Sequence, residues 1–295
     1  MEYSMIVGKV ERYVQSLIKP WPCNTNRASE IGHECERYLV FLRTKGGEKK
    51  LHSLDSQFIF MEGAIQERAV LRLLDDAGIE VIEQQRPFEW KDHQLTGHID
   101  GKIIVDGGLL PLEVKSMAPW IFDKTNTLDD FFNSKYYWIR KYPAQLTMYM
   151  LMDAKDRALF LLKNKSTGKL KEVLIELDYD YGESLVQKAE RVNQYIADKI
   201  IPEPIQWGDV CSKCDFNHIC VQEVLRTELE FVVDPDLEEK IIGYHELKPW
   251  YTKWKEIDEE LKESLRGVER LVVGEWLITG KPFGKGGWKI SYNKI

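Results

Sequence analysis

The stretch LTGHIDGKIIVDGGLLPLEVKSM, residues 95–117, constrains the fold of this 295-residue chain most strongly. Two runs rich in aliphatic and β-branched residues, 95–105 and 109–117, flank Asp-Gly-Gly at positions 106–108. Runs of this kind predict strands, and Asp-Gly between them is a strong signal for a tight hairpin. The sequence therefore predicts a pair of antiparallel strands at the centre of the fold.

The second strand of this hairpin carries charged groups on only one face. Side chains alternate along a strand, so Glu113 and Lys115 share one face while Leu112 and Val114 point to the other. The hairpin register brings Asp100 of the first strand beside Glu113. We therefore expect two carboxylates and a lysine to lie together on one face of a sheet.

Helical and strand patterns alternate around this hairpin. An apolar repeat at Ile65, Ala69, Leu73 and Ala77, joined by Val70 and Leu74, predicts a helix that Gly78 terminates. Another helix is expected around Ile31–Leu42, and the aromatic-rich segment 119–141 is expected to be a long loop. Further strands are predicted at 79–90, 157–164 and 170–178, and further helices at 142–154, 182–199 and within 234–266, before a terminal hairpin. The order of elements predicts an α/β fold.

Composition narrows the class of protein. Charged residues make up 30% of the chain, no apolar run is long enough to span a bilayer, and residues 1–20 lack the pattern of a signal peptide. We expect a cytoplasmic protein with no membrane partner. The net charge of −7 argues against a nucleic-acid coat or a histone-like binder, but it is compatible with a nuclease that has a local basic patch.

The paired carboxylates predict chemistry as well as structure. Two adjacent carboxylates repel each other unless a cation lies between them, and their oxygens suit hard cations such as Mg²⁺ or Mn²⁺. Such a cation polarises a phosphate and lowers the pKa of bound water, and a neighbouring lysine stabilises the growing negative charge. The alternative is an ordinary solvated strand, because acid-x-Lys is a common pattern.

Asp100, following Gly-His-Ile, together with Glu113-Val114-Lys115 resembles the PD-(D/E)xK nuclease signature. This resemblance implies a restriction-endonuclease-like core, with a mixed central sheet flanked by helices. Gln145 and Tyr149, four residues apart on one predicted helix, match the Q-x-x-x-Y motif of the RecB-type branch. In that branch, the glutamine and tyrosine contact DNA or the catalytic groups. The alternative is a core Tyr149 and a polar Gln145 at a helix end.

A second RecB-type motif lies on the preceding predicted helix. Gly63-Ala-Ile-Gln-Glu67 resembles the family's G-x-x-x-H or G-x-x-x-E pattern, whose last residue is a metal ligand. The resemblance thus implies metal ligation by Glu67, Asp100 and Glu113, completed by the backbone carbonyl of Val114. It covers roughly residues 28–222. The alternative for Glu67 is a surface glutamate.

Three of the five cysteines are clustered as Cys211-x2-Cys214-x5-Cys220. Thiolates select zinc or iron–sulfur clusters, but a zinc site usually combines Cys-x2-Cys with a second close pair, which is missing here. His218 is the alternative fourth ligand, in a Cys3His zinc site. Iron–sulfur members of the RecB-type nucleases have one cysteine before the nuclease core and three after it. The resemblance implies a structural 4Fe–4S cluster whose fourth ligand is Cys35, with Cys23 as the alternative.

Basic and aromatic residues suggest a path for DNA. Phosphates attract cations, and unpaired bases stack on aromatic rings. Segments 43–50 and 281–289 are basic, although the second is equally compatible with a simple turn. Residues 134–142 either bind DNA or pack the long loop onto the core; they interleave Lys135, Arg140 and Lys141 with Tyr136, Tyr137 and Trp138.

The sequence as a whole predicts a metal-dependent DNA exonuclease with a structural 4Fe–4S cluster, acting on single-stranded or free DNA ends in recombination, repair or CRISPR adaptation. The alternative is a catalytically silent DNA-binding or assembly subunit held together by zinc or iron–sulfur. Assembly with further copies, or with recombination or CRISPR proteins, is compatible with either function. We expect four segments: an N-terminal segment with the first cluster cysteine, a nuclease core, a helix with the cluster segment, and a C-terminal helical and hairpin extension (1–60, 61–180, 181–233 and 234–295).

Overall fold

The computed structural model describes residues 6–20, 23–105, 107–220, 235–284 and 287–295. The chain divides into two compact units, Met1–Thr227 and Glu228–Ile295. The finer division of residues 1–233 into three segments stays a prediction, and residues 221–234 lie outside the described part. None of the helices in the described ranges has the length and apolar character needed to cross a membrane.

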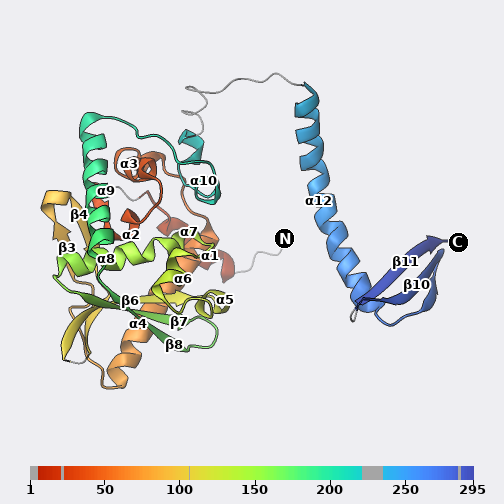
Figure 1. The fold of residues 1–295 in the computed structure, drawn as a ribbon, viewed down its shortest axis with the longest axis horizontal. Coiled ribbons are helices and arrows are strands. Elements are labelled where there is room, and N and C mark those ends of the chain that lie inside the picture. Colours follow the sequence, from red (N-terminus) through yellow and green to blue (C-terminus); the bar gives the residue numbers. More distant parts are fainter. Residues whose placement is uncertain (1–5, 21–22, 106, 221–234, 285–286) are drawn as a thin grey trace. The chain divides into compact units, whose positions relative to one another are not determined.

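A five-stranded mixed sheet forms the centre of the first unit (Figure 1). Its strand order is β2-β5-β6-β7-β8, and only β6 and β7 run parallel. A smaller sheet, of order β1-β4-β3, lies beside it. The strands of the large sheet are β2 Val81–Ile82, β5 Gly101–Val105, β6 Gly108–Met117, β7 Arg157–Asn164 and β8 Leu170–Glu176, and those of the small sheet are β1 Asn26–Arg27, β3 Pro87–Trp90 and β4 Leu95–His98.

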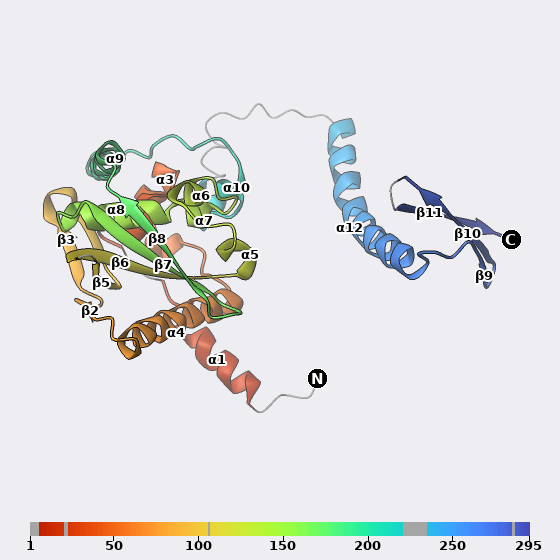
Figure 2. The same ribbon diagram turned by 60° about the horizontal axis from the view of Figure 1, so that its bottom comes forward.

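Helices cover both faces of the large sheet, as Figure 2 shows. On one face, α4 (Leu54–Asp76) packs Val70 and Leu74 against Leu112 and Leu159 in one buried cluster. On the other face, α8 (Tyr142–Met152) and α9 (Tyr179–Asp198) belong to a larger cluster that includes Phe160. The mixed sheet with helices on both faces agrees with the α/β class that the sequence predicts.

Shorter helices complete the first unit. They are α1 Val7–Leu17, α2 Ala28–Ile31, α3 Glu36–Thr44, α5 Pro119–Phe122, α6 Leu128–Phe132, α7 Tyr137–Arg140 and α10 Asp209–Ser212, with 3-10 turns η1 Gly46–Glu48 and η2 Lys91–His93. The expected long loop at 119–141 therefore contains three short helices, and the expected helix at 31–42 is two. The break between α2 and α3 lies where the chain packs closely against α8. A Cβ at Gly32 would lie only 2.7 Å from the Ala144 Cβ of α8.

Two predicted strands are also divided. The run 79–90 forms β2 and β3, and the run 95–105 forms β4 and β5, which belong to different sheets. Asp100 lies in the bend between β4 and β5 rather than on a strand. Glu83 and Gln85 adopt positive φ angles of 51° and 54°, which L residues other than Asn and Asp rarely adopt, so the alternation of apolar residues gives no sign of this turn.

The predicted apolar stripe of α4 is displaced. Ile65 and Leu73 are about half exposed, whereas Val70, Leu71 and Leu74 are buried against the sheet. Apolar residues lie on more than one side of this helix, and α1 also packs against it. The period of a helix therefore does not decide which of its apolar stripes meets the sheet.

The second unit consists of one long helix and a small sheet. Helix α12 spans Pro235–Ser264, and an antiparallel sheet of order β11-β10-β9 follows it (Figure 2). Its strands are β9 Arg270–Val273, β10 Trp276–Phe283 and β11 Gly287–Lys294. The expected terminal hairpin is present as β10 and β11, and β9 is an additional strand that turns into β10 at Gly274, where φ is 58°.

Candidate active site

Strand β6 presents Glu113 and Lys115 on one face of the central sheet. Leu112 and Val114 lie on the opposite face, in the apolar cluster under α4. The neighbouring residue of β7 in register with Glu113 is Phe160, which belongs to the cluster under α8. The alternation expected from the sequence is therefore present, and it places a carboxylate and an ammonium group at the α8 side of the sheet.

Asp100 reaches the same place from the bend before β5. The last paired residues of β5 and β6 on this side are Gly101 and Leu112, so Asp100 comes next to Glu113 in the register. Its Oδ2 accepts a hydrogen bond of 2.8 Å from the backbone N–H of Val114. Burial raises the pKa of Asp100 above its ordinary value, although Lys115 and the Val114 N–H oppose this shift. The structure thus brings Asp100, Glu113 and Lys115 together.

Glu113 is the most deeply buried of these groups, with 1% of its surface exposed. Its Oε1 lies 2.6 Å from the Nζ of Lys115, and its Oε2 is buried without a partner in the described part of the chain. Burial raises the pKa of Glu113 to about 8, and the negative charges of Asp100 and Glu67 add to the effect, while Lys115 lowers it. One carboxylate oxygen is therefore available to a further cation.

A chain of polar contacts leads from Lys115 into α8. Lys115 Nζ donates to Gln145 Oε1 at 3.3 Å, Gln145 Nε2 donates to the Tyr149 hydroxyl at 3.3 Å, and this hydroxyl donates to the His98 carbonyl at 2.7 Å. Burial acts to lower the pKa of Lys115, but Glu113, with help from Tyr142 and Asp100, raises it above its ordinary value. Lys115 is thus a fixed positive charge.

Gln145 and Tyr149 are both core residues and members of the polar contacts that lead to Lys115. Both are buried, and Tyr149 is packed into the core with 1% exposure, yet both belong to the contact chain of Lys115. Tyr149 also accounts for the glycine at position 97, because a Cβ there would lie 2.6 Å from the tyrosine ring. The tyrosine therefore helps to fix the segment that carries Asp100.

Glu67 joins the site through a residue that the sequence analysis missed. The side-chain amide of Gln85 donates to Glu67 Oε1 at 2.7 Å and to Asp100 Oδ1 at 3.3 Å. Burial raises the pKa of Glu67, and Asp100 raises it further. No sequence signal distinguishes Gln85 from Gln84, because both lie in a run that predicts an unbroken strand. We call Glu67, Asp100, Glu113 and Lys115 the carboxylate site.

No group of three or more His, Cys, Asp or Glu side chains in the described ranges is arranged to hold a metal ion. This finding covers both the acidic residues of the carboxylate site and the cysteines at 35, 211, 214 and 220. The Gln85 amide lies between two of the carboxylates, and the Lys115 ammonium holds the third. Val114 contributes its N–H to Asp100, and the role of its carbonyl as a metal ligand stays a prediction.

The fold brings Cys35, at the start of α3, to the three clustered cysteines. Burial raises the pKa of Cys211 and, to about 11, that of Cys214, and the charges of Cys35 and Cys220 raise both further. All five cysteines are free thiols. We call Cys35, Cys211, Cys214 and Cys220 the cysteine cluster.

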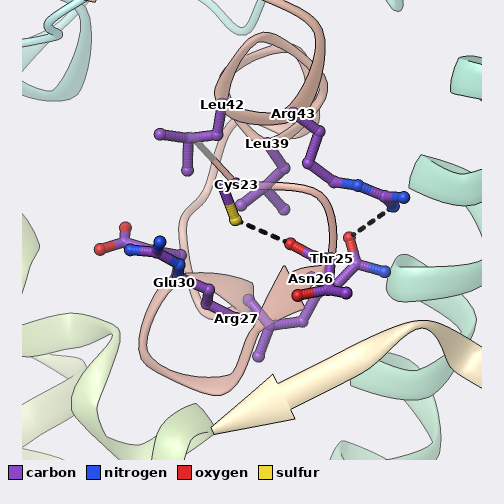
Figure 3. Close-up of a pocket in the computed structure, with 9 residues that line it drawn as sticks. Cys23, Thr25, Asn26, Arg27, Glu30, Leu39, Leu42 and Arg43 are labelled. Atoms are coloured by element: carbon purple, nitrogen blue, oxygen red, sulfur yellow. Dashed lines mark hydrogen bonds between the residues drawn. The ribbon is translucent and has the colours of Figure 1, made fainter. Parts of the chain in front are cut away.

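Cys23 lies elsewhere, in a small pocket beside α3 (Figure 3). Its Sγ donates to the Thr25 carbonyl at 2.9 Å, and the pocket is also lined by Asn26 and Arg43, whose side chains are hydrogen-bonded at 3.3 Å. None of the residues of the carboxylate site lines this pocket. Between the two upstream cysteines, the geometry therefore favours Cys35 over Cys23 as the neighbour of the downstream cysteines.

Aromatic packing holds the cysteine segment against α3. The fully buried Phe216 contacts the rings of Tyr38 and Phe41 edge-on, at centroid distances of 5.7 and 5.6 Å. Arg37 Nη1 lies 3.6 Å from Cys220 Sγ, and Lys49 pairs with Asp215 at 3.2 Å. Protein contacts thus join α3 and the turn after it to residues 215–220.

The aromatic residues of segment 134–142 pack onto the core, and the alternative, that this segment binds DNA, stays a prediction. Arg140 pairs with Glu34 and Asp209, and Lys141 pairs with Glu30, so these two charges are already used within the fold. Tyr136 and Trp138 pack against the core, but Trp120 beside them is 62% exposed and donates to the Tyr136 hydroxyl at 3.2 Å. The exposed aromatic surface is therefore smaller than the sequence suggests.

No protein-family model matches this chain, and neither does any curated protein. Among solved structures, similarity is found to the structure titled "Crystal structure of SSO0001", with 14% identity, 73% of this chain and 96% of that chain covered, and a TM-score of 0.46. An alkaline exonuclease (LHK-Exo) from Laribacter hongkongensis is similar at 14% identity, with 64% and 93% covered and a TM-score of 0.42. The structure of LHK-Exo in complex with dAMP is also similar, at 14% identity, with 60% of this chain and 89% of that chain covered and a TM-score of 0.41. Similarity at this level assigns neither a family nor an activity to this chain.

Proposed function

We propose that this chain is a metal-dependent DNA nuclease of the PD-(D/E)xK class, of the RecB type. The observation that carries the proposal is the carboxylate site: the fold gathers Asp100, Glu113 and Lys115, which resemble the family signature, and adds Glu67 at the expected place. Acidic groups that raise one another's pKa, as these do, are typical of sites that bind cations or transfer protons.

The donor set fits a divalent cation. Glu113 Oε2 is buried without a partner, and a cation beside it would remove both this deficit and the repulsion among Glu67, Asp100 and Glu113. Mg²⁺ or Mn²⁺ held by these carboxylates, with the Val114 carbonyl as the family implies, would supply a Lewis acid for the phosphate and a water of lowered pKa. Gln85 would then give up its contact with at least one carboxylate.

Lys115 contributes a positive charge next to the reacting phosphate. Its ammonium group is held by Glu113 and Gln145 and lies 4.8 Å from the centre of the Tyr142 ring. A charge fixed before the reaction stabilises the negative charge that develops on the phosphoryl oxygens, and it orients a water for attack. Gln145 and Tyr149 act in this proposal by holding Lys115 and the segment before Asp100, since both are buried.

We propose that the cysteine cluster holds a 4Fe–4S cluster with a structural role. Its support is the proximity of Cys35 to the downstream thiols and the soft donor set, which suits iron–sulfur or zinc. Metal binding would add to the aromatic contacts that already join the two ends of the unit. A preference for free or single-stranded ends, and a role in recombination, repair or CRISPR adaptation, rest on the family resemblance alone.

The nuclease proposal is tested with end-labelled single- and double-stranded DNA in the presence of Mn²⁺. Wild type is compared with Asp100→Ala and Lys115→Ala, and Lys165→Ala on an exposed turn is the matched control. We expect the two site variants to lose activity by at least about a thousandfold and the control to keep it. A protein that binds DNA but does not cut it with Mg²⁺ or Mn²⁺ would instead be the catalytically silent subunit.

The iron–sulfur proposal has an independent test. We expect protein purified without oxygen to be brown and to contain iron, and Cys35→Ser to lose both colour and iron. Cys23→Ser, the matched control, keeps both, because Cys23 lies in a different pocket. A colourless protein with one zinc would favour the Cys3His alternative, with His218 as a ligand.

A further inference from the structure

The sheet of the second unit has one face turned to α12. In the register of this sheet, Ile278 lies opposite Leu271 of β9 and Tyr292 of β11, so these residues share a face. Ile278 is buried, as is Leu265 just after α12, and Tyr292 interacts electrostatically with Asp258 of that helix. This face is therefore partly buried within the unit, with Leu271 and Tyr292 still 39% and 37% exposed.

The opposite face is open and carries positive charges. Lys281 lies directly opposite Lys289, and Thr279 lies opposite both Arg270 and Ser291. The three basic side chains are exposed, and no ion pair joins them to an acidic residue in the described part of the chain. Like charges directly opposite in a sheet repel each other, so the Lys281–Lys289 pair does not stabilise the fold. We call Arg270, Thr279, Lys281, Lys289 and Ser291, with Phe283, the open sheet face.

Charge is separated along this unit. Residues 270–295 contain five basic residues and one acidic residue, whereas residues 235–264 of α12 contain nine acidic and five basic residues. The single acid of the sheet segment, Glu275, pairs with Lys294 at 3.0 Å, and Lys294 shares the partly buried face of Ile278 because it lies opposite Trp276. The positive charges of the open sheet face are therefore not neutralised by the described acidic residues of this unit, so an anionic partner can bind them.

An exposed aromatic ring accompanies these charges. Phe283 follows Lys281 on the same face by strand alternation and is 66% exposed. Its opposite residue, Gly287, has no side chain to cover the ring. A ring beside cations and hydroxyl groups is the combination with which proteins bind unpaired nucleic acid strands, since bases stack on the ring while cations neutralise phosphates.

We infer that the open sheet face binds single-stranded nucleic acid, and that it provides a substrate-binding surface separate from the carboxylate site. The choice of nucleic acid as the partner rests on the proposed nuclease function. The positive charges provide complementarity to the phosphodiester backbone, and Thr279 and Ser291 offer hydroxyl donors between them. Phe283 adds a contact that an acidic peptide or a lipid headgroup would not use.

The test measures binding without cleavage. Fluorescence anisotropy of a labelled oligodeoxythymidylate of about 20 nucleotides is recorded with the full chain in EDTA, at several salt concentrations. The test variant is Lys281→Glu/Lys289→Glu, and the matched control is Lys253→Glu/Lys255→Glu, which makes the same charge change on exposed positions of α12. Circular dichroism melting verifies that both variants are folded, and Phe283→Ala provides a second test that changes no charge.

We expect the sheet variant to weaken binding by about tenfold or more and to lower the salt dependence by about two counterions, one for each lysine. The α12 control should bind as wild type does, and Phe283→Ala should weaken binding severalfold. Equal losses in sheet variant and control, or no loss in the sheet variant, would overturn the inference. So would equally strong competition by polyglutamate or by anionic lipid vesicles. This binding is measured in EDTA and requires no cleavage, so a failure of the nuclease proposal is distinguishable from a failure of this one.

Discussion

The carboxylate site and the cysteine cluster both gather ionisable side chains, but different forces hold them. In the carboxylate site, polar contacts balance the charges: Lys115 holds Glu113, and Gln85 bridges Glu67 and Asp100. In the cysteine cluster, the thiols are brought together from opposite ends of the unit by Phe216 packing on α3. The first site is therefore sensitive to charge and the second to packing, and this difference can be tested.

The largest effect is expected from packing at the cysteine cluster. Phe216→Ala removes a fully buried ring and should lower the free energy of unfolding by about 3–5 kcal/mol. Thermal and denaturant unfolding measure this loss, and thiol-reactive dyes should label the cysteine cluster faster. Phe58→Ala, at an exposed position of α4, is the matched control. Similar losses in the two variants would show that Phe216 does not hold the segment.

The stability of the protein should depend on pH through His33, which lies beside Cys35. His33 is buried, its ring stacks on Tyr38 with centroids 3.9 Å apart, and its Nδ1 accepts from the Cys35 N–H. Burial lowers the pKa of His33 from 6.5 to about 4, so the unfolded chain binds a proton more readily than the folded chain between these values. This contribution to stability is complete above pH 6.5 and is lost as the pH falls toward 4.

The size of this pH effect follows from the shift. It should reach on the order of 3 kcal/mol, measured as the difference in the pH dependence of unfolding between wild type and His33→Gln. Subtraction of the two profiles removes the contribution of the carboxylates, which titrate in the same range. Identical profiles in the two proteins would contradict the buried, neutral state of His33.

Coupling within the carboxylate site should be smaller. In a double-mutant cycle of Glu113→Gln and Lys115→Met at pH 9, each single variant leaves a buried group without its partner, and the double variant leaves neither. We expect a coupling free energy of about 2 kcal/mol. The same cycle with Arg72 and Asp76, an exposed pair on α4 at 2.7 Å, should give less than about 0.5 kcal/mol. Equal couplings would mean that burial does not strengthen the Glu113–Lys115 contact.

The smallest effect is expected from Gln85. Without metal, Gln85→Ala removes two hydrogen bonds to carboxylates and should lower the free energy of unfolding by about 1 kcal/mol. Saturating Mn²⁺ should abolish the difference between variant and wild type, because the cation would replace the amide between Glu67 and Asp100. Gln84→Ala is the matched control. A difference that persists with Mn²⁺ would show that the amide and the cation do not compete.

The sequence predicts those parts of the fold and site that local patterns determine. The alternation in Leu112–Lys115 fixes which side chains share a face, and Asp-Gly-Gly fixes the hairpin register that brings Asp100 to them. The turn at residues 83–85 was missed because positive φ angles at Glu83 and Gln85 have no signal in these residue types. The contacts of Gln85 with Glu67 and Asp100 were missed for the same reason, because they depend on this turn.

The cysteine cluster also depends on long-range contacts, which local sequence patterns do not predict. The spacing of Cys211, Cys214 and Cys220 predicts a ligand set, but spacing alone does not choose between Cys23 and Cys35. In the folded chain, Cys35 lies close enough to Cys214 to raise its pKa, whereas Cys23 lies in a separate pocket. The displaced stripe of α4 has the same cause, because apolar residues on several sides of a helix leave the contact with the sheet undecided.

The central claim is that the carboxylate site cuts DNA with a divalent cation. The most direct measurement is the single-turnover rate of nucleotide release from end-labelled DNA as a function of Mn²⁺ concentration, for wild type and Glu113→Gln. We predict no release in EDTA, a saturable rise with Mn²⁺ in wild type, and a rate at least about a thousandfold lower in the variant. Cleavage that persists in EDTA, or a variant as active as wild type, would contradict the account.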